Sequence, residues 1–168
     1  MQIFLIRHAI AATHPDGPPP ELLPAHIDPA DAARPLTPRG ARRFEDAVRG
    51  LSRLGIRFDR LYHSPLLRTV ETAELLEDIL EGESVVTPHL AAPPGEALLA
   101  SLEGDRVALV GHQPWLGELF GLLVMGTREA GAGVVWKKGG VAWLDGTPTP
   151  AGAQVRGFWS PRVLRTLR

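Results

Sequence analysis

Two short apolar runs, each followed by a histidine, constrain this chain more than any other feature. Residues 2–6 form a continuous apolar, partly β-branched run that stops at Arg7-His8, and residues 106–110 repeat this pattern shortly before His112. Such a run without alternation is typical of a strand that is buried on both faces of a parallel sheet. Ligands of open α/β sheets bind beyond the carboxyl ends of the strands, so the two histidines mark a predicted binding crevice.

Strand and helix patterns alternate between these two runs. Thr37-Pro38 supplies an N-cap followed by proline at the first helical position, and apolar spacing predicts a helix over residues 38–54. Further predicted elements are a strand at 58–62, a helix from Leu66 to about Leu80, a strand at Val85-Val86, a helix over 94–102 and a helix that begins at Trp115. The alternation predicts an α/β fold with three layers, α/β/α, and a mostly parallel central sheet.

The C-terminal part of the chain changes to short strands and turns. Residues 134–136 and 141–144 flank a Lys-Lys-Gly-Gly sequence, which predicts a β-hairpin, and residues 154–159 predict a last strand. Lys137-Lys138 is interpreted as part of the hairpin turn rather than as an anion site. We expect these strands to form an antiparallel C-terminal edge of the sheet.

A proline-rich segment at about residues 11–36 follows His8 directly. Because proline lacks a backbone N–H, this segment is not expected to form a helix or a central strand. Its length exceeds that of ordinary connections, which predicts a functional lid or a tolerated surface loop.

The composition excludes several classes of protein. The chain has no cysteine, so disulfides, thiolate metal sites and a cysteine nucleophile are excluded. Its formal charge of −1 gives no general attraction to nucleic acid or anionic lipid, and no apolar run reaches the roughly 18 residues of a membrane span. We expect a single cytoplasmic domain over residues 1–168, a monomer or weak homodimer without nucleic-acid or membrane partners.

Charged or polar residues follow three of the predicted strands. These are Arg7-His8, then Ser64 with Arg68 in the first turn of the next helix, and finally His112. If the strands are parallel neighbours, two imidazoles and two guanidiniums converge on one crevice. Guanidiniums match phosphate oxygens two at a time, and an imidazole can attack phosphorus. The constellation therefore predicts phosphoryl transfer.

These motifs resemble those of the histidine phosphatase superfamily, also called the phosphoglycerate mutase-like branch. Its Arg-His-Gly motif is similar to residues 7–9, its Ser-Pro-x-x-Arg…Thr-Ala motif to residues 64–73, and its Gly-His motif to residues 111–112. The chain most resembles SixA-type phosphohistidine phosphatases, through residues 7–11, residues 31–40 and the short aromatic C-terminal strand.

The resemblance implies a phosphoglycerate mutase-like fold and a role for each matched residue. His8 is implied to be the nucleophile that takes the phosphoryl group, while Arg7, Arg68 and His112 bind its oxygens and Ser64 adds a phosphate contact. His8 must be neutral at the attacking nitrogen, so we expect its other ring N–H to donate to a backbone carbonyl. No metal or cofactor is expected, because the arginines supply the positive charge.

The sequence lacks a clear counterpart of the carboxylate with which many members protonate the leaving oxygen. A phosphohistidine nitrogen can leave without such an acid, which favours a phosphohistidine protein as substrate and a role in signal transduction. Candidate proton donors are Glu96, Asp16, Glu21 and His63. Two departures from the family pattern, Ala9 for glycine and Glu71 for glutamine, leave the charged positions intact.

Two alternatives stay open at this point. One is a broad-specificity phosphomonoesterase that acts on small phosphate esters, and the other is a binding module that keeps the phosphate pocket without the chemistry. A mutase is disfavoured, because retention of the phosphoryl group needs a pocket closed to water. The remaining histidines, His14, His26 and His89, are interpreted as solvated, and the tryptophans as packing residues.

Overall fold

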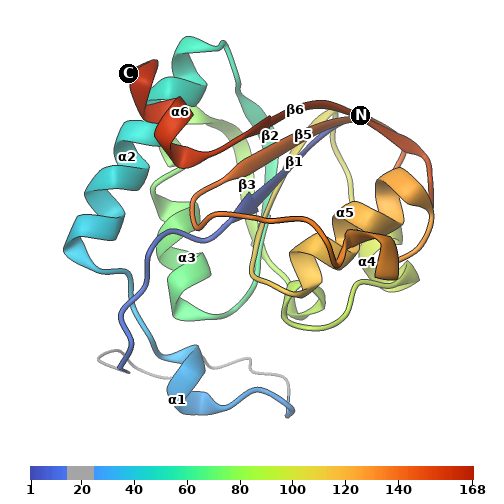
Figure 1. Ribbon diagram of the computed structural model, residues 1–168, viewed down its shortest axis with the longest axis horizontal. Coiled ribbons are helices and arrows are strands. Elements are labelled where there is room, and N and C mark those ends of the chain that lie inside the picture. The colour runs from blue at the N-terminus through green and yellow to red at the C-terminus, as the bar shows by residue number, and fades with distance from the viewer. Residues whose placement is uncertain (15–24) are drawn as a thin grey trace.

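A six-stranded sheet forms the centre of the protein (Figure 1). The structure is a computed structural model that describes residues 1–14 and 25–168. The strands are β1 (Gln2–Arg7), β2 (Phe58–His63), β3 (Leu80–Val86), β4 (Arg106–Gly111), β5 (Val141–Gly146) and β6 (Ala153–Trp159), in the order β3-β2-β4-β1-β5-β6. The first four are parallel, whereas β5 and β6 are antiparallel. The predicted mostly parallel sheet with an antiparallel C-terminal edge is confirmed.

Helices cover both faces of this sheet, so the predicted α/β/α layering is also confirmed (Figure 1). The helices are α1 (Pro29–Ala32), α2 (Pro38–Arg53), α3 (Leu67–Glu74), α4 (Glu96–Ala100), α5 (Trp115–Met125) and α6 (Pro161–Thr166), with 3₁₀ turns η1 (Glu77–Ile79), η2 (Pro88–Ala91) and η3 (Glu129–Gly131). None of the described helices is both long and apolar enough to cross a membrane.

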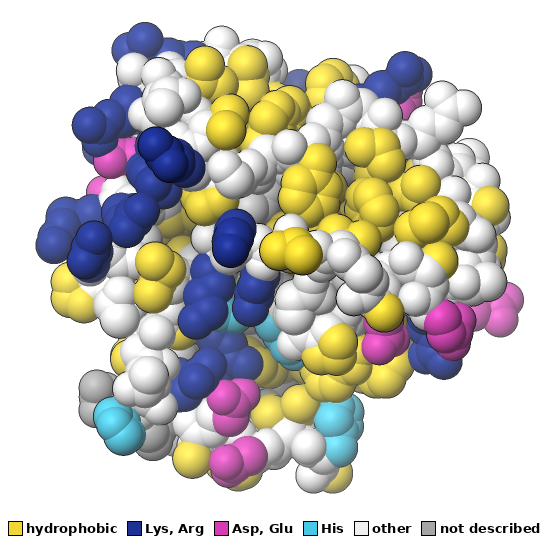
Figure 2. Space-filling model, viewed as in Figure 1, with side chains coloured by type: hydrophobic (Ala, Val, Ile, Leu, Met, Phe, Trp, Pro, Cys, Tyr) yellow, Lys and Arg dark blue, Asp and Glu magenta, His cyan; other side chains and the backbone are white. Residues whose placement is uncertain are grey.

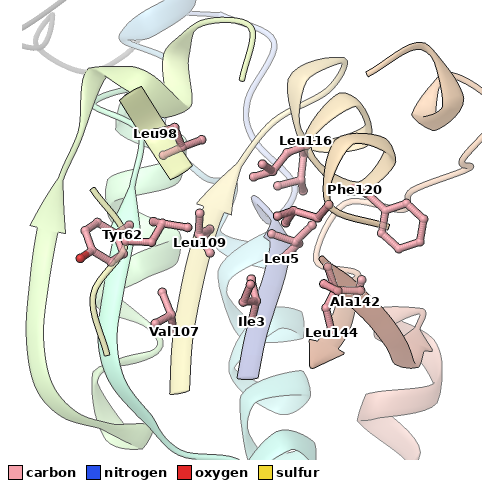
Figure 3. Close-up of a cluster of buried hydrophobic side chains, with 14 of the residues drawn as sticks. Ile3, Leu5, Tyr62, Leu98, Val107, Leu109, Leu116, Phe120, Ala142 and Leu144 are labelled. Atoms are coloured by element: carbon pink, nitrogen blue, oxygen red, sulfur yellow. The ribbon is translucent and has the colours of Figure 1, made fainter. Parts of the chain in front are cut away.

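The central strand β1 supplies both halves of the core. Successive side chains of a strand point to opposite faces, so Ile3 and Leu5 pack on the α4/α5 side, as Figure 3 shows. Phe4 and Ile6 pack on the opposite side, beneath α2 and α3. All four side chains are buried, which explains why the sequence of this strand is apolar without alternation.

Helix α2 begins and ends close to its predicted limits. The Thr37 hydroxyl accepts a hydrogen bond from the Gly40 N–H at 2.9 Å, which caps the helix, and Pro38 occupies the first helical position. Its buried face includes Phe44 and Leu51. The sequence spacing therefore predicted both the start and the buried face of this helix.

The predicted hairpin of residues 134–136 with residues 141–144 is wrong. β5 already has β1 on one side and β6 on the other, so residues 134–136 have no free strand edge to pair with there. Val135 is 77% exposed, while the Trp136 side chain is buried and its indole N–H donates to the Gly140 carbonyl at 3.0 Å. The hairpin in this region is β5–β6.

Two further predictions need correction. The second predicted helix ends at Glu74 rather than near Leu80, because a 3₁₀ turn follows and Leu80 begins β3 opposite Phe58. The segment at 11–36 also contains a helix, α1, since Pro29 stands at its first position, where a missing N–H costs nothing, and Asp28 caps it. Residues 15–24 of that segment lie outside the described part of the chain.

The packing of α6 against α2 depends on a glycine. A Cβ on Gly50 would lie 2.1 Å from the Leu164 carbonyl oxygen, far inside van der Waals contact. We therefore expect Gly50→Ala to lower the free energy of unfolding by roughly 1–3 kcal/mol in urea denaturation, although alanine is the better helix former. Gly133→Ala is the control, because a Cβ there meets nothing within 4 Å. A Gly50→Ala protein as stable as the wild type would contradict this close packing.

Candidate active site

The carboxyl ends of three neighbouring parallel strands meet at one edge of the sheet. Arg7 is the register partner of Gly111, and His63 is the partner of Val110. The His8 N–H extends this alignment by donating to the Gly111 carbonyl at 3.0 Å. Strands β2, β4 and β1 are therefore neighbours in the sheet, as the predicted convergence of the charged residues requires.

The end of β1 is also held by the loop that precedes β5. The Arg7 N–H donates to the Gly140 carbonyl, and the Gly139 N–H donates to the carbonyls of both Arg7 and His8, each at 3.0 Å. Gly139 has a φ of 79°, a left-handed conformation that glycine adopts without strain. Arg7 and His8 are thus fixed by backbone contacts on both sides.

The His8 imidazole is buried, and its proton position is defined. Its Nδ1 lies 2.7 Å from the Ala9 carbonyl oxygen. A carbonyl only accepts, so Nδ1 carries the proton and Nε2 keeps its lone pair. Burial lowers the pKa of His8 to about 3, with further lowering by the charges of Arg68 and Arg7 against the opposing effect of the Ala9 bond. The expectation of a neutral His8 that donates to a backbone carbonyl is confirmed.

Thr72 joins the end of β1 to helix α3. Its hydroxyl accepts from the Ala9 N–H at 3.1 Å and donates to the Arg68 carbonyl at 2.6 Å. A residue four positions after Arg68 lies one helical turn further on, which places this hydroxyl above the Arg68 backbone. The spacing between Arg68 and Thr72 in the sequence motif therefore has a structural reason.

The two guanidiniums have buried N–H groups without partners. Arg7 Nη1 donates to the Trp136 carbonyl, and Arg68 donates to the backbone carbonyl and carboxylate of Asp31 at 2.7 and 2.9 Å. The Nε atoms of both arginines are buried and have no hydrogen-bond partner among the described residues. Burial lowers the pKa of both side chains. Buried donors without partners are costly, and at a site of this kind they indicate a place for an anion.

His112 completes the cluster from the end of β4. Its ring lies edge-on to Trp115, with ring centroids 4.8 Å apart, and its Nδ1 is buried without a partner in the described part of the chain. Burial lowers its pKa to about 4, and the charges of Arg68 and Arg7 lower it further, whereas Asp31 raises it. The structure brings His8, Arg7, Arg68 and His112 together, and their charges act on one another.

Ser64 and His63 occupy the turn between β2 and α3. The buried Ser64 hydroxyl accepts from the Leu66 N–H at 3.4 Å, and the Ser64 carbonyl accepts from Nδ1 of His63 at 3.0 Å and from the Thr69 hydroxyl at 2.7 Å. Burial lowers the pKa of His63. These contacts order the turn that leads to Arg68.

The structure separates the remaining candidate proton donors from the cluster or does not describe them. Glu96 is exposed at the start of α4 and lines a hollow with Leu122 and Pro148 rather than with His8. Asp16 and Glu21 lie outside the described residues. His63 is therefore the candidate among the described residues that lies at the same edge of the sheet as His8.

Sequence reasoning assigned no site role to Asp31 and Arg34, and it interpreted Lys138 as a hairpin-turn residue rather than as part of an anion site. Asp31 binds Arg68 and also forms an ion pair with Arg34 at 3.1 Å. Burial lowers the pKa of Lys138, and the charges of Arg7, Arg34 and Arg68 lower it further, so this side chain adjoins the cluster. The three-residue spacing of Asp31 and Arg34 was the available signal, but a short helix among prolines was not expected there.

Comparisons with known proteins agree with this geometry. The family model of the histidine phosphatase superfamily (branch 1) matches residues 3–92. An uncharacterized protein of Picosynechococcus sp. is 34% identical over 152 residues, which cover 86% of this chain and 84% of that protein.

Solved structures match almost the whole chain. The protein histidine phosphatase SixA complexed with tungstate has a TM-score of 0.73 and 23% identity, with 98% of this chain and 99% of that chain covered. The alpha-ribazole phosphatase from Shigella flexneri has a TM-score of 0.68 and 18% identity, with 96% and 97% covered. Such matches confirm the phosphoglycerate mutase-like fold. The chain therefore belongs to the histidine phosphatase superfamily, branch 1, and is a hydrolase of the phosphatase class.

Proposed function

We propose that this phosphatase removes the phosphoryl group from phosphohistidine on a protein, through a covalent phosphohistidine intermediate on His8. The observation that carries the proposal is a neutral imidazole with its free Nε2 in a cluster where two buried guanidinium N–H groups have no partner among the described residues. Likeness to a SixA structure, described as a protein histidine phosphatase, supports the same substrate class.

In the first step, His8 Nε2 attacks phosphorus, and the bond between phosphorus and the substrate nitrogen breaks. The electron pair of that bond stays on the departing imidazole, whose other nitrogen carries a proton. Charge spreads over the three equatorial oxygens in the transition state. Arg7, Arg68 and His112 are fixed before the reaction and donate to these oxygens, so they stabilise the transition state without reorganisation.

In the second step, a water molecule attacks phosphorus and the bond to His8 Nε2 breaks. The electron pair returns to Nε2, the water oxygen stays on phosphorus with both of its protons, and dihydrogen phosphate leaves. The hydrogen bond from Nδ1 to the Ala9 carbonyl keeps the imidazole in one orientation during both steps. The arginines hold the transferred group in place while the attacking and leaving groups exchange.

Among the described residues, the carboxylate that contacts this cluster is bound to guanidiniums, which favours a nitrogen leaving group. Asp31 accepts a hydrogen bond from Arg68 and is paired with Arg34. Its carboxylate therefore positions guanidiniums and does not serve as a proton donor to the substrate. An alkoxide needs a proton donor as it leaves, whereas a neutral imidazole does not. This supports phosphohistidine over phosphate esters.

A comparison of substrates tests the proposal. We expect kcat/KM for a phosphohistidine peptide to exceed that for the phosphoserine peptide of the same sequence by at least about tenfold, because the imidazole leaves without an acid whereas the serine alkoxide needs one. Brief reaction with labelled phosphoramidate and then alkaline denaturation should leave acid-labile phosphate on the wild type and none on His8→Ala. His89→Ala is the control, because His89 is an exposed histidine and should be labelled normally. A preference for esters, or labelling of His8→Ala, would remove the proposal.

The buried histidines also predict how stability depends on pH. The folded pKa values of about 3 for His8 and about 4 for His112 lie below the ordinary value of 6.5. The unfolded chain thus binds protons first, and stability falls as pH drops from 6.5 toward 5, by up to about 1.4 kcal/mol per pH unit for each histidine. Urea unfolding without phosphate or sulfate measures this slope. The dependence of the unfolding free energy on pH should be weaker in the His8→Asn/His112→Asn variant. An equal slope in both proteins would contradict its assignment to these two histidines.

Asp31 is expected to position Arg68 for the transferred group. Asp31→Asn removes the ionic contact at 2.9 Å but keeps the backbone carbonyl that Arg68 also contacts. We expect kcat/KM for a phosphohistidine peptide to fall by roughly 10 to 100-fold, since small displacements of a phosphate-binding group are costly. Arg34→Gln tests whether the ion pair with Arg34 contributes. Unchanged kinetics in Asp31→Asn would show that Asp31 does not position Arg68.

A further inference from the structure

A small hollow of about 50 Å³ lies directly beyond His8 and outside the phosphate-binding cluster. It is lined by Ala9 and Ile10, the residues that follow the proposed nucleophile, and by three cationic side chains: Arg43 of α2, Lys138 of the loop before β5, and Arg165 of α6. These cations come from segments far apart in the sequence. We refer to Arg43, Lys138 and Arg165 as the second basic cluster.

The backbone around the second basic cluster is held by close packing. A Cβ on Gly40 would lie 2.2 Å from the Ile10 carbonyl oxygen, so α2 approaches the chain after His8 as closely as glycine allows. The corresponding approach of Gly50 to Leu164 places α6 against α2. Lys138 precedes Gly139, whose N–H binds the carbonyls of Arg7 and His8. The positions that carry the three cations are therefore fixed relative to His8.

These positive charges are not neutralised by the described residues. None of the three cations forms an ion pair there; Asp46, an acidic residue of α2, pairs instead with Arg49 and Arg168. Burial lowers the pKa of Arg165, and the neighbouring charge of Arg43 lowers it further, while the charge of Asp46 opposes these effects in part. Like charges held together without a counterion attract an anion.

Positive charge continues beyond the hollow. Figure 2 shows a band of Lys and Arg side chains that runs across this face from the α2 and α6 side toward histidine side chains at its centre. Arg39 and Arg42 of α2 and Arg162 of α6 are exposed and extend the cationic surface of these helices. The band is thus longer than the hollow itself, and its length fits an extended acidic partner.

We propose that the second basic cluster binds acidic side chains that flank the phosphohistidine of a partner protein. This inference rests on the proposed function, because it concerns the surface that surrounds the same phosphoryl group. The hollow takes one anionic group such as a carboxylate and is too small for a sugar or a base. A partner protein places several carboxylates along the band at once, which a small phosphorylated molecule does not do.

Two histidine-phosphorylated peptides test the inference, one with Asp and Glu beside the phosphohistidine and one with Asn and Gln at the same positions. For the wild type we expect a higher kcat/KM on the acidic peptide, and an advantage that shrinks as sodium chloride rises from 50 to 300 mM, because salt screens exposed charges. Arg43→Gln/Arg165→Gln should lower kcat/KM on the acidic peptide by about tenfold. Its activity on the neutral peptide and on phosphoramidate should stay at the wild-type level.

Arg53→Gln/Arg128→Gln is the matched control, since it removes the same charge at the far end of α2 and beyond α5. It should keep the preference for the acidic peptide. Equal loss on both peptides in Arg43→Gln/Arg165→Gln, or no loss, would overturn the inference. If Arg43→Gln/Arg165→Gln lost activity only on a sugar bisphosphate, the cluster would instead bind the second phosphate of a small substrate, and the inference would be overturned. A wild type that hydrolyses phosphoramidate but prefers esters to both peptides would instead refute the proposed function.

Discussion

Burial of two guanidiniums beside two imidazoles is the constraint on which this site depends. Burial lowers the pKa of every one of these groups, and the guanidinium charges lower the pKa of both imidazoles further. Arginine stays charged in a protein, so the histidines respond by staying neutral. A neutral imidazole is a nucleophile, whereas an imidazolium is not. In the proposed mechanism, the same electrostatic arrangement that attracts phosphate thus keeps His8 neutral for the attack on it.

The fold supplies this arrangement mostly through backbone contacts. Parallel strands bring Arg7 and Gly111 into register, and Gly139 closes the other side of β1 with bonds to two carbonyls. Asp31 is the exception, because it reaches Arg68 with both its carbonyl and its side chain from the short helix α1. In the described part of the chain, one carboxylate among the cations fixes Arg68 without neutralising the cluster, so an anion can still bind there.

The sequence predicted the features that local patterns determine. The unbroken apolar run before Arg7 indicated a buried parallel strand, and Thr37-Pro38 indicated the start of α2. Residues 134–136 were placed in a strand because a hydrophobic run beside a glycine turn looks the same whether or not a partner edge is free. Only the sheet order shows that β1 and β6 already occupy both edges of β5.

Local sequence patterns likewise predicted only part of the active site. The four charged positions each follow a strand or begin a helix, so their approximate convergence followed from topology alone. Asp31, Arg34 and Lys138 come from a short helix and a loop whose placement depends on tertiary contacts, and no periodicity reveals those contacts. Lys138 was interpreted as a turn residue, and it does lie in a turn, but that turn is bound to the end of β1.

The active-site cluster is buried, whereas the second basic cluster is partly exposed. This difference in burial gives the two clusters different proposed roles. The Arg68 side chain is 5% exposed, so in the proposed mechanism its interaction with phosphate is little screened and acts on the chemical step. Lys138 is exposed and Arg43 and Arg165 are partly exposed, so salt screens their interactions, which act mainly on encounter and orientation. Under the proposed function, the buried cluster accepts any accessible phosphohistidine. Selection among partner proteins is then proposed to depend on the exposed charges that surround this cluster.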